Sequence, residues 1–186
     1  MNIRMGKILI NLTDLENYKS VIKWVNEYYQ NTRMITIHGD TEIDFGVCMW
    51  VLENIESPNR VDFLVEPIQY FPKGTLKLKV DTLTISFGRF VRLPHLQALT
   101  GSEYTIVNAD VNDEDVNQFL HGLVGGSNSN LRKLRLQGYG IAVITDVLKD
   151  LNAREIENGK WNFELENGDT ATVLEHCNID ILINRA

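Results

Sequence analysis

Short runs rich in leucine and β-branched residues recur along this chain at nearly regular intervals. One apolar residue taken from each run gives a series whose members lie 21 to 28 residues apart: Ile37, Phe63, Ile85, Ile106 and Leu134. Intervals of roughly 20 to 29 residues are typical of stacked strand and helix units. A right-handed crossover through each helix makes the strands parallel and leaves the helices on one side. The spacing therefore predicts an α/β fold, a leucine-rich-repeat-like stack with a mainly parallel, curved sheet.

The segments between these runs carry helix signals. Thr13 and Glu16 have the spacing of a capping box, so we expect a helix to begin there. Asn112, which precedes three acidic residues, is a good N-cap for a helix that ends near Gly125. Three further helices are expected over residues 45–55, closed by Ser57-Pro58, over residues 93–101 and over residues 141–151.

The last part of the chain has a different pattern. Two tight-turn dipeptides, Asn158-Gly159 and Asn167-Gly168, lie between alternating apolar and polar runs. Such dipeptides are strong hairpin signals, so residues 152–186 are expected to form an antiparallel β-meander that caps the stack of residues 1–151. Residues 70–80 alternate apolar residues with lysine, which predicts an edge strand or hairpin arm. The 186 residues suit a single domain spanning 1–186.

Charge and composition narrow the classes of partner. The formal net charge is -7, whereas binding to nucleic acid needs a basic face that neutralises phosphates. No apolar run approaches the roughly 18 residues of a membrane span, and the N-terminal apolar stretch is too short for a signal peptide. Cys48 and Cys177 are too few for a disulfide framework. We therefore expect an intracellular protein, cytoplasmic or nuclear, with neither nucleic acid nor membrane as a partner.

The sequence shows no grouping of residues typical of catalysis. His38, His95, His121 and His176 are scattered without metal-ligand spacing, so neither metal nor cofactor is expected. Residues 110–115 resemble a calcium loop but lack its glycine, and helix capping accounts for these acids. A chain that is not an enzyme is therefore predicted. The alternative left open is a small α/β enzyme that uses carboxylates at strand ends, such as Asp40, Asp110 or Asp113.

Each expected strand also has a second face, which points away from the helices. Parallel sheets normally have both faces covered, so we expect a protein partner to cover this face. Two alternatives stay open: residues 70–80 or another segment of the chain cover it, or the face pairs with a second copy. The candidate protein-binding residues, two from each of five strands, are Thr36, His38, Asp62, Leu64, Thr84, Ser86, Thr105, Val107, Lys133 and Arg135.

Five motifs occur in an order that a known family shares. They are residues 83–85 (LTI), 91–96 (VRLPHL), 115–120 (DVNQFL), 126–134 (GSNSNLRKL) and 167–173 (NGDTATV). Together with the helix between Tyr18 and Tyr29, they extend over most of the chain and resemble the nematode F-box-associated domain, type 2. Phe90 and Leu123 stand where that family tends to have tryptophan.

The resemblance implies the target-binding part of an F-box protein, a substrate receptor of cullin-RING ubiquitin ligases. In such receptors a separate F-box holds a Skp-type adaptor. Because the first dozen residues are expected to form a strand, we expect the chain to be an excised fragment or a free-standing relative. An adaptor is then a partner only if an F-box exists outside this chain, and the expected function is protein–protein recognition of an unidentified target.

Overall fold

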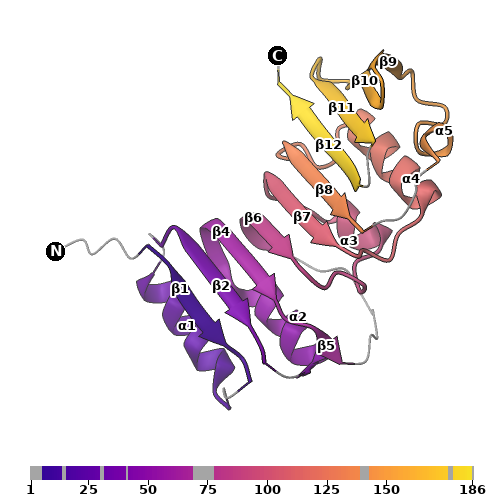
Figure 1. Ribbon diagram of the computed structural model, residues 1–186. Coiled ribbons are helices and arrows are strands. Elements are labelled where there is room, and N and C mark those ends of the chain that lie inside the picture. Colours follow the sequence, from indigo (N-terminus) through magenta and orange to yellow (C-terminus); the bar gives the residue numbers. More distant parts are fainter. Residues whose placement is uncertain are drawn as a thin grey trace.

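The structure is a computed structural model that describes residues 6–13, 16–29, 32–40, 42–68, 78–138, 143–175 and 178–185. Among these residues, a 10-stranded sheet runs through the molecule (Figure 1). Its parallel part follows chain order: β1 (Ile8–Asn11), β2 (Met34–His38), β4 (Glu56–Leu64), β6 (Lys79–Ile85), β7 (Glu103–Val107) and β8 (Lys133–Gln137). The expected α/β class with a mostly parallel sheet is confirmed.

Four antiparallel strands, here called the meander, continue the same sheet beyond β8. Their order is β12 (Asn178–Asn184), β11 (Thr170–Glu175), β10 (Lys160–Glu164) and β9 (Arg154–Glu157). Both predicted Asn-Gly turns are confirmed, since Gly159 and Gly168 have φ values of 70° and 86°. The last strand of the chain, β12, pairs with β8. The meander therefore extends the sheet sideways, and β9 is its free edge.

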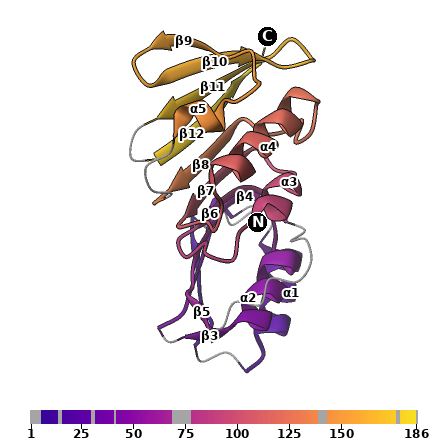
Figure 2. The same cartoon turned by 90° about the vertical axis from the view of Figure 1, so that its right-hand side faces the viewer.

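Helices cover one face of the sheet. They are α1 (Tyr18–Tyr28), α2 (Phe45–Asn54), α3 (Leu93–Gln97), α4 (Asp113–Val124) and α5 (Ile144–Val147). Figure 2 shows the sheet with α1 to α4 along the same side. Beneath them lie ten strand residues that are at most 1% exposed: Ile35, Ile37, Val61, Phe63, Leu83, Ile85, Tyr104, Ile106, Leu134 and Leu136. In β6, β7 and β8 the buried residues alternate with more exposed ones, which is the period-two pattern of a strand with one covered face. In β2 and β4, Thr36 and Asp62 are also buried, although they point to the other face.

Asparagine side chains hold the C-terminal ends of three helices. The Asn26 amide donates to the carbonyl of Asn54, the last residue of α2, at 2.7 Å. The Asn117 amide donates to the carbonyls of Val147 and Lys149 at the end of α5. The Asn128 amide reaches the carbonyl of Leu99 just after α3, at 2.7 Å. Because the last carbonyls of a helix lack partners within it, these contacts fasten each helix to a neighbouring segment.

The two predicted helix caps have different outcomes. The Asn112 N-cap is confirmed, and it forms a capping box: its side chain accepts from the Asp115 amide at 2.9 Å, and the Asp115 carboxylate accepts from the Asn112 amide at 3.1 Å. The box at Thr13 is wrong, because α1 begins at Tyr18 after the N-cap Asn17. The Thr13 hydroxyl instead accepts from the amide of Asp40 at 2.6 Å. That hydroxyl therefore fixes the loop after β2 and does not cap a helix.

Several predicted boundaries shift. Ser57-Pro58 does not close a helix, since α2 ends at Asn54 and β4 continues through both residues. The register between β4 and β6 shifts between Ser57 and Arg60, which accommodates a proline that cannot donate to the ladder. The helices expected over residues 93–101 and 141–151 are shorter, namely α3 and α5. Residues 141–142 lie outside the described part of the chain.

The predicted edge strand over residues 70–80 is wrong where the structure describes it. Residues 69–77 lie outside the described residues, but Lys79 and Val80 begin β6. That strand lies between β4 and β7, and Val80 is 1% exposed. A separate parallel pair of short strands, β3 (Ile43–Asp44) and β5 (Pro67–Ile68), lies beside the main sheet. Among the described helices, none has the length and apolar character that crossing a bilayer requires.

Candidate functional site

The face of the sheet opposite the helices, which none of the described helices covers, is here called the uncovered face and carries side chains in transverse rows. A row forms because directly paired residues on neighbouring strands point to the same side. The central row runs across seven strands: Leu9, Thr36, Asp62, Thr84, Thr105, Arg135 and Asp180. A second row, one pleat away, contains Met34, Arg60, Thr82, Glu103, Lys133 and Leu182. The fold thus places polar and charged residues from distant segments next to one another.

The predicted binding residues gather on this face. Nine of them belong to the strands, and Ser86 directly follows β6. The predicted pair on β8, Lys133 and Arg135, is displaced by one pleat relative to the pairs on the other strands. Val107 pairs with Gln137, which therefore continues its row. Lys133 and Arg135 therefore belong to the second and central rows. Whether these residues contact a partner stays a prediction.

Access to the face differs along the sheet. Thr36 is only 4% exposed, and its hydroxyl has no hydrogen-bond partner among the described residues. Asp62 is 9% exposed, whereas Leu64 on the same strand is 39% exposed. A partner therefore reaches the side chains over β4 to β8 more readily than Thr36 on β2.

Two ion pairs hold arginines in place on this face. Arg60 Nε donates to Asp62 Oδ1 at 2.7 Å along β4. Arg135 Nε donates to the two carboxylate oxygens of Asp180 at 2.8 and 3.0 Å, and its Nη2 also donates to this carboxylate. The hydrogen bonds with Asp180 raise the pKa of Arg135, so that guanidinium stays charged. Carboxylate partners at Nε fix the planes of both guanidinium groups and leave further N–H donors unused by these pairs.

A hollow of about 280 Å³ lies on the uncovered face between these arginines. Its centre is made of short side chains on β6 and β7, flanked by long cationic side chains on β4 and β8. The lining includes Arg60, Thr82, Thr84, Glu103, Thr105, Lys133 and Arg135. The hollow therefore results from the difference in side-chain length between the middle strands, β6 and β7, and the flanking strands, β4 and β8.

A second hollow, of about 560 Å³, lies near the carboxyl ends of β6 to β8. Arg89, Arg92, Asn108, Asp110 and Gly138 are among its lining residues. Arg92 and Asp110 already form an ion pair at 2.9 Å. Two lining residues have left-handed backbone, with φ values of 58° at Asn108 and 66° at Gly138. This hollow is thus bounded by tight turns, by the ion pair of Arg92 with Asp110 and by the second cation, Arg89.

The three carboxylates considered for catalysis do not converge. Asp40 follows β2 and Asp110 follows β7, with β4 and β6 between them, a separation of roughly 14 Å at about 4.8 Å per strand. Asp113 accepts a hydrogen bond from the amide of Val143 at 2.9 Å. Each carboxylate therefore serves its own loop or helix end.

Three of the histidines and Cys48 also have structural positions, whereas His176 and Cys177 lie outside the described residues. His95 is 4% exposed, and its Nδ1 accepts from the amide of Arg92 at 3.0 Å. His121 Nε2 bonds the carbonyl of Lys149, and His38 lies 3.6 Å from Asp40. Burial raises the pKa of Cys48 to about 12, which keeps that thiol protonated. Within the described residues, no three His, Cys, Asp or Glu side chains are grouped so as to hold a metal ion.

Three charged residues of the site were missed in the sequence. Arg60 and Glu103 each lie two residues before a predicted member of the face, Asp62 and Thr105. Extending the alternation by one step would have included both. Asp180 had no such signal, because its pairing with Arg135 depends on β12 lying beside β8.

Comparisons with known proteins add no relative to this picture. No protein-family model, no curated protein and no solved structure matches the chain.

Proposed function

We propose that this chain is a protein-recognition domain, not an enzyme, and that it binds a target protein through the uncovered face between β4 and β8. One observation carries the proposal: the rows of polar and charged side chains, with a hollow among them, that the parallel strands bring together on this face. A parallel sheet with helices on one side leaves such a face for a partner.

A leucine-rich-repeat-like stack is the finer form of the proposed fold. It is supported by the order of the parallel strands, each beside the strand that precedes it in the main sheet. It is also supported by the helices on one face, since stacked units contact only their neighbours and present a broad surface.

We further propose that the domain is the target-binding part of an F-box-type ubiquitin ligase receptor. The support is the sequence resemblance to the F-box-associated domain, whose motifs occupy defined places here. Residues 115–120 lie in α4, residues 167–173 form the turn into β11, and Asn128 of the GSN motif binds the end of α3. A Skp-type adaptor is a partner in this proposal only through an F-box outside this chain.

Affinity purification with a pair of matched variants tests the binding face. Thr84→Trp fills the hollow, whereas Thr145→Trp adds the same ring at an exposed position of α5. We expect mass spectrometry to find proteins that the unmodified chain and Thr145→Trp retain and that Thr84→Trp loses by about tenfold or more. The melting temperature of each variant controls for folding.

Two outcomes would overturn the proposal: no protein bound reproducibly, or the same set retained by Thr84→Trp. Sedimentation at micromolar concentration separates target binding from self-pairing, because pairing of two copies through this face would give a dimer that Thr84→Trp dissociates. Binding of the full native gene product to a Skp-type adaptor tests the ligase assignment separately.

A further inference from the structure

The hollow on the uncovered face differs from its surroundings in charge. Three cationic side chains, Arg60, Lys133 and Arg135, line it together with one carboxylate, Glu103. The whole chain has a formal net charge of -7. The lining itself therefore carries more cationic than acidic groups, although the chain as a whole is acidic, and two further carboxylates, Asp62 and Asp180, are paired with its arginines.

The three cations differ in how many of their hydrogen-bond donors are already used. Asp62 and Asp180 bind Arg60 and Arg135 through Nε, and so partly neutralise them. Arg60 forms its pair through Nε, which leaves its terminal N–H groups outside that pair. Lys133 lies directly opposite Glu103 in the register, yet the structure records no ion pair for its ammonium group among the described residues. The unused hydrogen-bond donors of the hollow thus belong to two guanidinium groups held in place and to one unpaired ammonium.

The size of the hollow limits its occupant. A volume of about 280 Å³ lies at the lower end of the range of roughly 300–1,000 Å³ for pockets that enclose whole small molecules. It therefore suits one or two side chains of a larger partner. Planar guanidinium groups match carboxylates in geometry, and the hydroxyls of Thr82, Thr84 and Thr105 add donors and acceptors between them.

We infer that the hollow receives a carboxylate side chain from an acidic peptide segment of the protein partner. The inference rests on the proposed function, since it names the chemistry that the uncovered face recognises. Arg60 approaches the carboxylate from the β4 side, and Lys133 and Arg135 approach it from the β8 side. The ion pairs with Asp62 and Asp180 act as positioning contacts, because they orient the two guanidinium groups before the partner arrives.

A displayed library of random twelve-residue peptides, selected on the full chain, tests this inference. We expect the selected peptides to contain Asp or Glu, and the synthetic peptides to bind about tenfold more weakly after Glu→Gln or Asp→Asn substitution. Binding should also weaken as sodium chloride rises from 50 to 500 mM. These measurements change only the peptide and the salt, so they do not depend on the folding of any protein variant.

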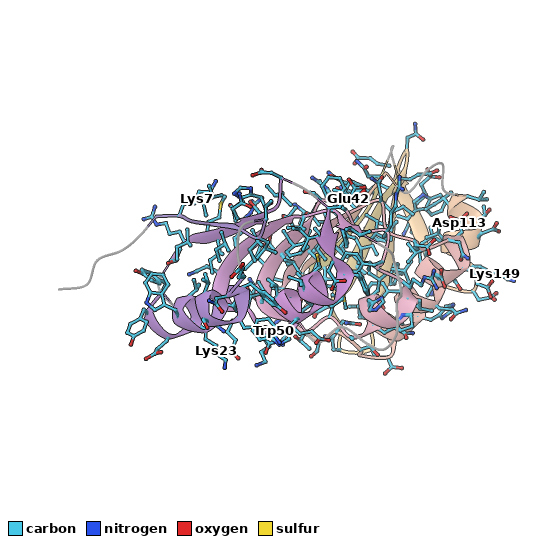
Figure 3. All side chains as sticks on the ribbon, turned by 90° about the horizontal axis from the view of Figure 1, so that it is seen from below. Lys7, Lys23, Glu42, Trp50, Asp113 and Lys149 are labelled. Atoms are coloured by element: carbon cyan, nitrogen blue, oxygen red, sulfur yellow. The ribbon has the colours of Figure 1, made fainter. Side chains whose placement is uncertain are left out.

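Charge reversal in the protein provides the second measurement. Lys133→Glu removes an unpaired cation and is expected to weaken peptide binding by about tenfold or more. The control Lys23→Glu makes the same change on the exposed helical side, where Lys23 projects from α1 (Figure 3), and should leave binding unchanged. Lys133 is preferred to the arginines because its loss leaves no carboxylate without a partner.

The outcomes separate this inference from the proposed function. Some peptides could lose binding in Thr84→Trp and yet bind the unmodified chain equally well with Gln in place of Glu. That result would overturn recognition of a carboxylate and leave the proposed binding face intact. Peptides that still bind Thr84→Trp would overturn the inference, because they do not occupy the hollow, and the affinity purification then decides the binding face separately. A library that yields no binder would overturn recognition of a short acidic segment, while the affinity purification still decides whether the face binds a folded protein.

Discussion

The parallel part and the meander belong to one sheet, but they are specified in different ways. In the meander, β9, β10, β11 and β12 are neighbours both in the chain and in the sheet. Short turns therefore set their pairing. In the parallel part, a crossover separates each strand from the next, and the register is set where apolar residues meet the helices. Local turn chemistry specifies the first arrangement and long-range packing the second.

The middle of the parallel part and the free edge of the meander also differ in how completely they are buried. Val61 and Phe63 of β4 are 0% exposed, whereas every residue of β9 is exposed. A strand in the middle of the parallel part has neighbours on both sides, and the free edge of the meander has one. We therefore expect the parallel part to contribute more of the free energy of unfolding per residue than the meander.

The largest difference between the parts is expected from removing one buried ring in each. Phe63→Ala in β4 and Phe163→Ala in β10 both delete a phenylalanine, for which losses of about 3–5 kcal/mol are typical. Phe63 is 0% exposed, and Phe163 is 3% exposed on the strand beside β9. We expect Phe63→Ala to lie near the top of this range and Phe163→Ala near the bottom. Urea denaturation measures both, and an equal or reversed order would contradict the comparison.

Two glycines with left-handed backbone give the next largest difference. Gly138, after β8, has a φ of 66°, and a methyl group there would lie 2.2 Å from Asn108 Oδ1. Gly168, in a meander turn, has a φ of 86° and nothing within 4 Å of that position. Gly168→Ala should cost about 1–2 kcal/mol from backbone strain alone. Gly138→Ala should cost more, because the Asn108 side chain must also move.

Asn108→Gly provides the control for that pair, since it removes the side chain that a methyl group at position 138 would meet. In the Asn108→Gly background, the cost of Gly138→Ala measured by urea denaturation should fall towards that of Gly168→Ala. A cost that does not change would mean that Asn108 is not the obstacle.

Alkaline pH should weaken the parallel part through Cys48 of α2. The thiol is 0% exposed, and burial raises its pKa from an ordinary value of 9.0 to about 12. The stability that it contributes is present below the unfolded pKa and is lost as pH rises towards the folded value. At pH 10 the expected loss is about 1.4 kcal/mol. Urea denaturation at pH 8 and 10 should show a smaller loss in Cys48→Ala, and identical losses would count against this origin.

The smallest difference is expected between two asparagines that accept backbone hydrogen bonds. Asn112→Ala removes the cap of α4 and should cost about 1 kcal/mol. Asn167→Ala removes a bond from the Asp169 amide, at 3.0 Å, and a bond to the Asp169 carboxylate, at 2.8 Å. Because both bonds are exposed in a meander turn, the cost should stay within about 0.5 kcal/mol. Thermal denaturation of both variants measures the two costs. A larger cost at Asn167 would show that the turn, and not only the strands, stabilises the meander.

The success of sequence-based prediction follows the same division. Both Asn-Gly turns occur where they were predicted, because their signals lie within a few residues of the structure they specify. The inward pairs of the parallel strands were also predictable, since their spacing of two is a property of each strand alone. The Asn112 cap and the start of α4 are of this local kind too.

What could not be predicted depends on contacts between distant segments. The Thr13 hydroxyl binds the amide of Asp40, 27 residues away, and so does not serve the helix that its spacing suggested. The alternating pattern that includes Lys79 and Val80 predicted an edge strand, whereas these residues belong to β6, which lies between β4 and β7. The candidate site was predictable to the same extent. The alternation within each strand identified most of its members, but not the contacts between them. The pairing of Arg135 with Asp180 depends on where β12 returns.

The order of the parallel strands has a consequence for how such domains diversify. Because each strand lies beside the one before it in the main sheet, one strand with its helix can be gained or lost without rethreading the rest of the chain. The sheet would then widen or narrow by about 4.8 Å. Descendants of one ancestor can in this way alter the breadth of the sheet while the packing within each remaining unit stays the same.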